Sequence, residues 1–360
     1  MPFIVLMLLI SYVTGLTVHY ARYAAHGGQT AWTYLIIKGI LLSVLCFAVY
    51  RLAGKYGIAL LEKYRQPIFC IGTGVLLLFA MFEYRLGRVN TPVLSRLIAY
   101  VYEALPILRV LTLCAFVLCL QTLLTEPLKV KNVALLTVGF VFGAIAHDII
   151  KLIMLIVLAD ALIRFFQQKS EKLNVSAVVV CVLSAGLFAY LVYAGIIGCR
   201  YLMNEWYLTD YMTQVSHGVW RQAKLFGTME NFQAAGGSVS YFGLLWAVAF
   251  LGIIPAVMIV LILAVLTAFV LKRNAHAHRL SALSRLVIIY LAVRTVIALL
   301  TNCGVFFHSF MTPMPMLSDT AAGMLSVYWL LGIFGQIGHP NSEKAKFCTL
   351  DGAAAKRKGR

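Results

Sequence analysis

The stretch Asn302–Gly335, NCGVFFHSFMTPMPMLSDTAAGMLSVYWLLGIFG, joins two apolar runs through a short proline-containing loop. Pro313 and Pro315 cannot donate backbone hydrogen bonds and have a fixed φ angle, so this loop is stiff. Ser318 and Asp319 follow at the entrance to the second apolar run. A stiff loop between two apolar helices predicts a shaped site rather than a flexible tether.

The composition of the chain sets its class. Of its 360 residues, 62% are hydrophobic and only 12% are charged, and the mean hydropathy is +0.89. A soluble domain could not bury that much apolar surface, so we predict an all-α polytopic membrane protein. The formal net charge of +17 lies mostly in short loops between apolar runs, which favours a role in topology over nucleic-acid binding.

About ten apolar runs approach the roughly 20 residues that cross a bilayer. Their ranges are about 2–21, 31–53, 67–84, 105–125, 132–147, 150–167, 174–199, 240–271, 285–304 and 319–338. The fifth and sixth are the least clearly separated. If they formed one long helix, the chain would have nine spans and the C-terminus would change sides.

The distribution of Lys and Arg favours ten spans with both termini cytoplasmic. In that orientation the predicted cytoplasmic segments are the basic ones, including the connection between the second and third spans with Arg51, Lys55, Lys63 and Arg65. Residues 1–338 then form a single transmembrane domain, and residues 339–360 form a basic cytoplasmic tail. One long external loop, about 200–239, carries aromatic residues such as Trp220 that suit the outer membrane interface.

The P-x-P-x-x-S spacing of Pro313, Pro315 and Ser318 resembles the P-L-P-F-x-S-Y-G-G signature of the SEDS family. This family comprises polytopic membrane proteins that include FtsW, RodA and SpoVE. The upstream segment Asn302-Cys303-Gly304 resembles the family's Asn-x-Gly. The chain departs from the signature at Asp319-Thr320-Ala321, where the family has Tyr-Gly-Gly.

The resemblance extends weakly over the C-terminal half. The pair Leu251-Gly252 is similar to the end of the family's E-E-L-G, and on that alignment Tyr241 stands at the position of the family's external-loop acid. Asp148 is similar to the acid of the family's Q-P-D-L-G-T segment. The family's two glutamates fall on Ala249 and Phe250.

The resemblance implies a peptidoglycan glycosyltransferase on the outer face of the bacterial cytoplasmic membrane. It would polymerise glycan from undecaprenyl-linked lipid II during cell division, elongation or sporulation, with a single-span transpeptidase, a class B penicillin-binding protein, as partner. Such chemistry needs a groove open to lipid, cations for the diphosphate, and a carboxylate that takes a proton from the sugar hydroxyl. It implies no certain cofactor, although a divalent cation could assist at the diphosphate.

The candidate bases lie in the external loop. They are Glu230 and Asp210, together with Tyr241, whose phenol has a reference pKa of about 10 and is a poor base near neutral pH. The eight cysteines show no metal-ligand spacing, so we predict no protein metal site. The candidate substrate-binding residues are Arg221, Lys224, Asp148, Lys151, Asn302, Pro313, Pro315, Ser318 and Asp319.

Several candidates also have a structural interpretation. Arg221 and Lys224 could contact lipid headgroups instead of a substrate. Asp148 and Lys151 lie three residues apart, on one helix face, and could form an ion pair. Asp319 could cap the last helix.

Inside the spans, Arg294 is a plausible partner for Asp160.

Two further functional hypotheses remain open. A catalytically inactive SEDS-like protein could act as a scaffold for a transpeptidase or a division complex, because Tyr241 replaces the family's acid. A lipid-substrate flippase or transporter would explain the charges within the spans. The sequence shows neither an internal repeat nor paired broken spans, which such transporters often have.

Overall fold

The computed structural model describes residues 2–25, 32–86, 92–125, 130–145, 149–167, 178–187, 189–190, 214–227, 229, 243–275, 282–305, 314–316 and 321–337. The regular structure of these residues is helical, with further short helices over 178–187 and 214–222. The main elements are α1 (Pro2–Ala25), α2 (Trp32–Leu52), the π-helical turn η1 (Ala53–Gly57), α3 (Ile58–Leu86), α4 (Pro92–Thr125), α5 (Val130–Ile145), α6 (Ile149–Gln167), α9 (Gly243–Leu251), α10 (Ile253–Ala275), α11 (Ala282–Asn302) and α12 (Ala321–Ile337).

These helices make the chain a helical membrane protein. Within the described residues, four helical stretches are long and apolar enough to cross a membrane: Ile36–Phe79, Leu105–Leu124, Ile253–Lys272 and Ala282–Asn302. Shorter apolar helices cover Pro2–Gly15, Val130–Gly143, Val178–Leu187 and Ala321–Gly335. Each predicted apolar range therefore contains a helix, whereas the crossing of all ten ranges and the cytoplasmic termini stay predictions.

The weakest predicted boundary, between the fifth and sixth spans, separates two helices. α5 ends at Ile145, α6 begins at Ile149, and the two helices contact each other. A single continuous helix could not place its two halves side by side. The structure therefore supports two elements in this part of the chain.

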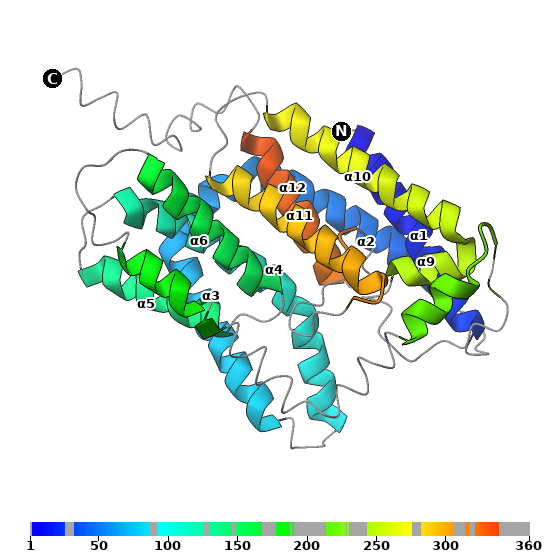
Figure 1. Cartoon of the computed structure of the whole chain (residues 1–360), viewed down its shortest axis with the longest axis horizontal. Coiled ribbons are helices and arrows are strands. Elements are labelled where there is room, and N and C mark those ends of the chain that lie inside the picture. The colour runs from blue at the N-terminus through cyan, green and yellow to red at the C-terminus, as the bar shows by residue number, and fades with distance from the viewer. Residues whose placement is uncertain are drawn as a thin grey trace.

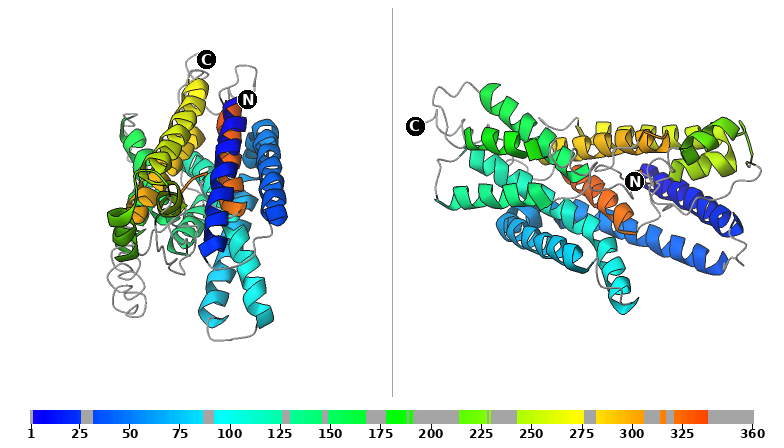
Figure 2. Two further views of the ribbon diagram at one scale, coloured as in Figure 1. Left: turned by 90° about the vertical axis from the view of Figure 1, so that its right-hand side faces the viewer. Right: turned by 60° about the horizontal axis from the view of Figure 1, so that its bottom comes forward.

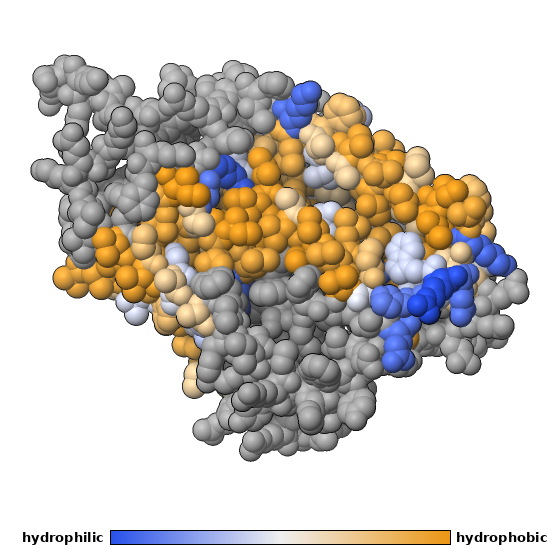
Figure 3. Space-filling model, in the orientation of Figure 1, coloured by the Kyte–Doolittle hydropathy of each residue, from blue (hydrophilic) through white to orange (hydrophobic). Residues whose placement is uncertain are grey.

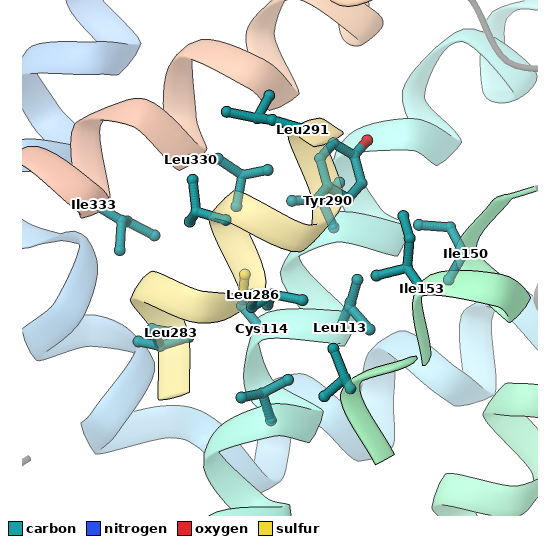
Figure 4. Packing of buried hydrophobic residues seen from close by; sticks show 14 of the residues in the cluster. Leu113, Cys114, Ile150, Ile153, Leu283, Leu286, Tyr290, Leu291, Leu330 and Ile333 are labelled. Carbon is teal, nitrogen blue, oxygen red and sulfur yellow. The ribbon is translucent and has the colours of Figure 1, made fainter. Parts of the chain in front are cut away.

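The last apolar run lies at the centre of the helix bundle. α12 packs against α2, η1, α4, α10 and α11, and its Val327, Tyr328 and Leu331 are fully buried (Figures 1 and 2). Figure 4 shows how leucine side chains from α11 and α12 meet beside Cys114 of α4. The other end of α11, where the candidate site lies, packs in a separate apolar cluster with α9.

The connection between the second and third predicted spans is helical rather than a loop. The chain stays helical from Trp32 to Leu86, with a non-helical φ/ψ pair at Tyr64 (φ −113°, ψ 18°). Pro67 accounts for this kink because its ring clashes with the carbonyl four residues earlier, at Lys63. Charged residues mark the end of an apolar run without breaking a helix, and Figure 1 shows that the chain still changes direction between α2 and α3.

Close packing holds this turn against the end of α12. A Cβ atom on Gly332 would clash with the Tyr50 carbonyl oxygen and lie 2.8 Å from Ala53 Cβ. A Cβ on Gly54 would in turn lie 3.3 Å from the Gly332 carbonyl oxygen. Glycine at these positions lets the two helices approach closely.

The predicted run 240–271 is broken into two helices. α9 ends at Leu251 and α10 begins at Ile253, with Gly252 between them at φ +94°. Glycine adopts positive φ without the steric cost that a side chain would add. The break leaves helix-terminal N–H and C=O groups that need partners, and the candidate site supplies them.

Candidate functional site

The candidate site is a junction at the C-terminal end of α11. Helix 214–222 of the predicted external loop packs here against α9 and α11, and its Val219 is 2% exposed. Trp220 Nε1 donates a hydrogen bond of 2.8 Å to the carbonyl oxygen of Asn302. The loop is thus attached to the helix bundle at a defined place.

Asn302 connects three elements of this junction. Its side chain is completely buried, its Oδ1 accepts a 2.9 Å hydrogen bond from the backbone N–H of Leu245, and its Nδ2 donates to the Ala298 carbonyl at 2.8 Å. Leu245 lies in the first turn of α9, where backbone N–H groups have no partner within the helix. Asn302 therefore caps α9 from α11 while its own carbonyl holds Trp220.

The end of α11 has the hydrogen bonds of a Schellman motif. Gly304 has φ +86°, its N–H donates to the Thr301 carbonyl at 3.1 Å, and the Val305 N–H donates to the Leu300 carbonyl at 2.9 Å. A Cβ on Gly304 would lie 2.9 Å from the His217 ring. The Asn-x-Gly segment thus ends α11 and lets helix 214–222 approach it closely.

The segment 223–229 bridges the break between α9 and α10. The N–H groups of Gly227 and Met229 donate to the Leu251 and Ala249 carbonyls at 3.0 and 2.8 Å. At the start of α10, the Ile253 and Ile254 N–H groups donate to the carbonyls of Lys224 and Leu225, at 3.0 and 3.1 Å.

These four bonds satisfy both ends of the broken helix with backbone atoms of one neighbouring segment. Backbone N–H and C=O groups at a helix break need such protein partners wherever water cannot reach them.

The surface of this segment is cationic and apolar together. Arg221 and Lys224 are exposed, and beside them Leu225 and Phe226 are 63% and 65% exposed. Figure 3 shows hydrophilic residues gathered at the lower right of the molecule, near α9, beside a broad apolar surface. Cations next to exposed apolar side chains suit a phosphate group at a membrane interface.

The described part of the proline corner, residues 314–316, is buried, and its Met314 packs in the same junction. Met314 is 4% exposed and packs in the apolar cluster of α9 and α11, and Pro315 is also buried. Met316 has φ +65°, which is uncommon for a residue with a side chain, and its Sδ lies 3.8 Å from Thr267 Oγ1 of α10. Tertiary packing holds this corner in a strained backbone conformation.

Charged residues inside the bundle have polar partners. Asp160 of α6 forms an ion pair with Arg285, at 2.9 Å, and its suggested pairing with Arg294 stays a prediction. Arg294 is 3% exposed and donates a 2.9 Å hydrogen bond to the Tyr290 hydroxyl.

The Asp160–Arg285 ion pair lies far from the candidate site along α11. Arg285 lies at the opposite end of α11 from Asn302, so the pair brings the end of α6 to the end of the bundle away from the junction.

Lys151 has an aromatic neighbour. Its Nζ lies 4.9 Å from the centre of the Tyr190 ring, a cation–π distance, and the residue is half-buried. Asp148, its predicted ion-pair partner, lies outside the described residues. Also outside them are the predicted Asp210, Glu230, Tyr241, Pro313, Ser318 and Asp319.

The described residues place no group of three or more His, Cys, Asp or Glu side chains together as metal ligands. A cavity of about 20 Å³ lies between α4, α5, α6 and helix 178–187, with apolar side chains such as Phe116, Met154 and Leu187 as its walls. An apolar cavity of this size does not suit a diphosphate.

The sequence did not identify Trp220 as a part of the junction. Its aromatic neighbours in the external loop suggested a membrane-interface role, whereas the structure attaches it to the end of α11. Its position three residues after His217, which contacts Gly304, is a helical spacing. That spacing, within a loop that also carries buried Val219, is the signal that could have identified a docked helix.

A chain of known structure has the same overall architecture. It comes from a structure described as "Structural coordination of polymerization and crosslinking by a peptidoglycan synthase complex", with a TM-score of 0.56 and 14% sequence identity. The two chains share a fold. The likeness covers 94% of this chain and 98% of the other, whereas no protein-family model and no curated protein sequence matches.

Proposed function

We propose that this chain is a divergent SEDS-type membrane protein that acts in peptidoglycan synthesis by polymerising glycan from undecaprenyl-linked lipid II. The observation that carries the proposal is the fold, which is shared over nearly the whole length with a chain of a peptidoglycan synthase complex. The P-x-P-x-x-S and Asn-x-Gly segments support it, because Asn302, Gly304 and Met314 lie in one junction with helix 214–222.

In the proposed reaction, a sugar hydroxyl of one saccharide attacks the anomeric carbon of the other. The bond from that carbon to the diphosphate oxygen breaks, and undecaprenyl diphosphate leaves with the bonding electrons. Glu230 or Asp210 takes the hydroxyl proton, and Arg221 and Lys224 offset the charge on the diphosphate. Exposed cations beside Leu225 and Phe226 suit a ligand that joins a diphosphate to a lipid chain.

A polymerisation assay tests this reaction. The purified chain in vesicles with lipid II should produce glycan strands on a gel, and Glu230→Gln with Asp210→Asn should abolish them. Replacing Arg221 and Lys224 by Gln should lower kcat/KM by about 10-fold or more. Gln222→Ala is the matched control, since Gln222 is an exposed neighbour on the same segment. Absence of strands from the unaltered chain would refute the polymerase activity.

The alternative function is a catalytically inactive scaffold for a class B penicillin-binding protein or a division complex. It is favoured by Tyr241, which stands where the SEDS family has an acid. The same preparations separate the two functions. A scaffold retains binding of a single-span transpeptidase in a pull-down while making no glycan, and the double carboxylate variant has no effect on growth.

A further inference from the structure

The turn between α2 and α3 carries a two-part stripe on its exposed side. Four large side chains spaced four residues apart form its apolar part. Leu52 is 58% exposed, Tyr56 46%, Leu60 53% and Tyr64 43%. The opposite side of the same turn carries the buried residues Ala53, Gly57 and Leu61.

The second part of the stripe is cationic. Arg51, Lys55 and Lys63 are exposed, and each directly precedes one of the large side chains. Lys55 Nζ lies 4.8 Å from the centre of the Tyr56 ring, and Lys63 Nζ lies 5.1 Å from that of Tyr64. Glu62 and Arg65, the other charged residues of this turn, are both half-buried, so the exposed side is positive.

The length of the helical stretch places this turn at a membrane surface. A straight helix from Trp32 to Leu86 would be about 80 Å long, far more than the roughly 30 Å of hydrocarbon in a bilayer. α2 alone has 21 residues, enough for one crossing. The charged residues 51–65 must then lie where the chain leaves the hydrocarbon, and the change of direction in Figure 1 agrees with this.

We infer that the stripe Arg51–Tyr64 lies in the headgroup region of the membrane and binds anionic phospholipid. Tyrosine and lysine side chains pair an apolar body with a polar tip, which suits the level of the headgroups. The cations attract phosphate groups that carry net negative charge, and the predicted cytoplasmic leaflet presents such lipids. This surface lies at the other end of the bundle from the candidate site and does not rest on the proposed function.

Spin-labelled lipids test the inference with the full chain reconstituted in phosphatidylcholine vesicles. The measurement is the ratio of the association constants of spin-labelled phosphatidylglycerol and spin-labelled phosphatidylcholine. We expect a ratio above one for the unaltered chain that decreases as salt screens the cations. Replacing Lys55 and Lys63 by Gln should lower the ratio by about five-fold or more, because each cation near an anionic surface contributes substantially.

The matched control replaces Lys131 and Lys272 by Gln. These residues are also exposed on predicted cytoplasmic segments but lie outside the stripe and its aromatic side chains, so the ratio should decrease less than in the stripe variant. Far-UV circular dichroism of each variant should show that the helices persist, because the replaced residues are exposed. An equal ratio in the stripe variant and the unaltered chain overturns the inference. A ratio of one for the unaltered chain also overturns it, because the stripe would then have no preference for phosphatidylglycerol and could serve a protein partner instead.

Discussion

Two interruptions of helical stretches in this molecule are satisfied in different ways. At Gly252 the helix ends and restarts, and the distant segment 223–229 supplies backbone partners to both helix ends. Between α2 and α3 the chain stays helical through η1 and the kink at Tyr64, and it leaves a positive, apolar stripe exposed. An interruption bridged by another segment fixes that segment in space, whereas an interruption within a continuous helix creates a surface.

The bridged break should be the more sensitive of the two. In Gly252→Ala, the new Cβ would lie 2.7 Å from both the Leu225 carbonyl oxygen and Phe226 Cα, at a φ of +94°. Backbone strain and overpacking together should lower the free energy of unfolding by about 2–5 kcal/mol. The measurement is unfolding of the purified chain in mixed detergent micelles.

Gly227→Ala separates these two contributions. Gly227 has a similar φ of +86°, but a Cβ there would meet nothing within 4 Å. Its replacement should cost only the backbone strain of about 1–2 kcal/mol. Equal losses in the two variants would show that segment 223–229 is not held tightly against Gly252.

The packing beneath the continuous turn should respond less strongly. Gly332→Ala would press a Cβ against the Tyr50 carbonyl and Ala53, and we expect a loss of about 1–3 kcal/mol in the same unfolding measurement. Gly74→Ala, at a helical position with nothing within 4 Å, should instead be neutral or stabilising by up to about 1 kcal/mol. A neutral Gly332→Ala would mean that α12 and η1 separate without cost.

The sequence predicted the helical ranges better than the contacts between them. Each apolar run that hydropathy located contains a helix, and Pro67 explains the kink at Tyr64. The charges of Lys55 and Lys63 suggested a loop, because charged residues often mark the end of a span. The bridge at Gly252 uses backbone atoms of Lys224 and Leu225, and backbone groups are the same in every residue. No residue pattern could therefore reveal it.

The candidate site was predicted only in part for the same reason. The proline corner and Asn302 were identified from a motif, and Asn302 and Met314 of that corner lie in the junction. The capping of Leu245 by Asn302 joins residues that are 57 positions apart in the sequence. Tertiary packing brings these two residues together. The motif therefore indicated the place, while the contacts that shape the place came from the structure.

Asn302 provides a test of the junction itself. Asn302→Ala would leave the buried N–H of Leu245 without its acceptor, and the expected loss of unfolding free energy is about 1–3 kcal/mol. Thr295→Ala is the control, because the Thr295 hydroxyl donates only to the Leu291 carbonyl of its own helix. Trp220→Phe should cost about 1 kcal/mol, since it removes one hydrogen bond and keeps an aromatic ring. If Asn302→Ala proved as mild as the control, another group would cap α9.

The smallest effect is expected at the ion pair of Asp160 and Arg285, away from the junction. These side chains are 30% and 17% exposed, so water and salt screen them partly, and a double-mutant cycle with Asp160→Asn and Arg285→Gln should give a coupling of about 0.5–1 kcal/mol. The coupling should decrease with ionic strength, whereas the cost of Asn302→Ala should not, because Asn302 is uncharged and buried. A coupling energy that does not change with ionic strength would contradict this difference between the ion pair and Asn302. The two ends of α11 would then be held by the same kind of buried contact, although the structure holds one with neutral hydrogen bonds and the other with an ion pair near the surface.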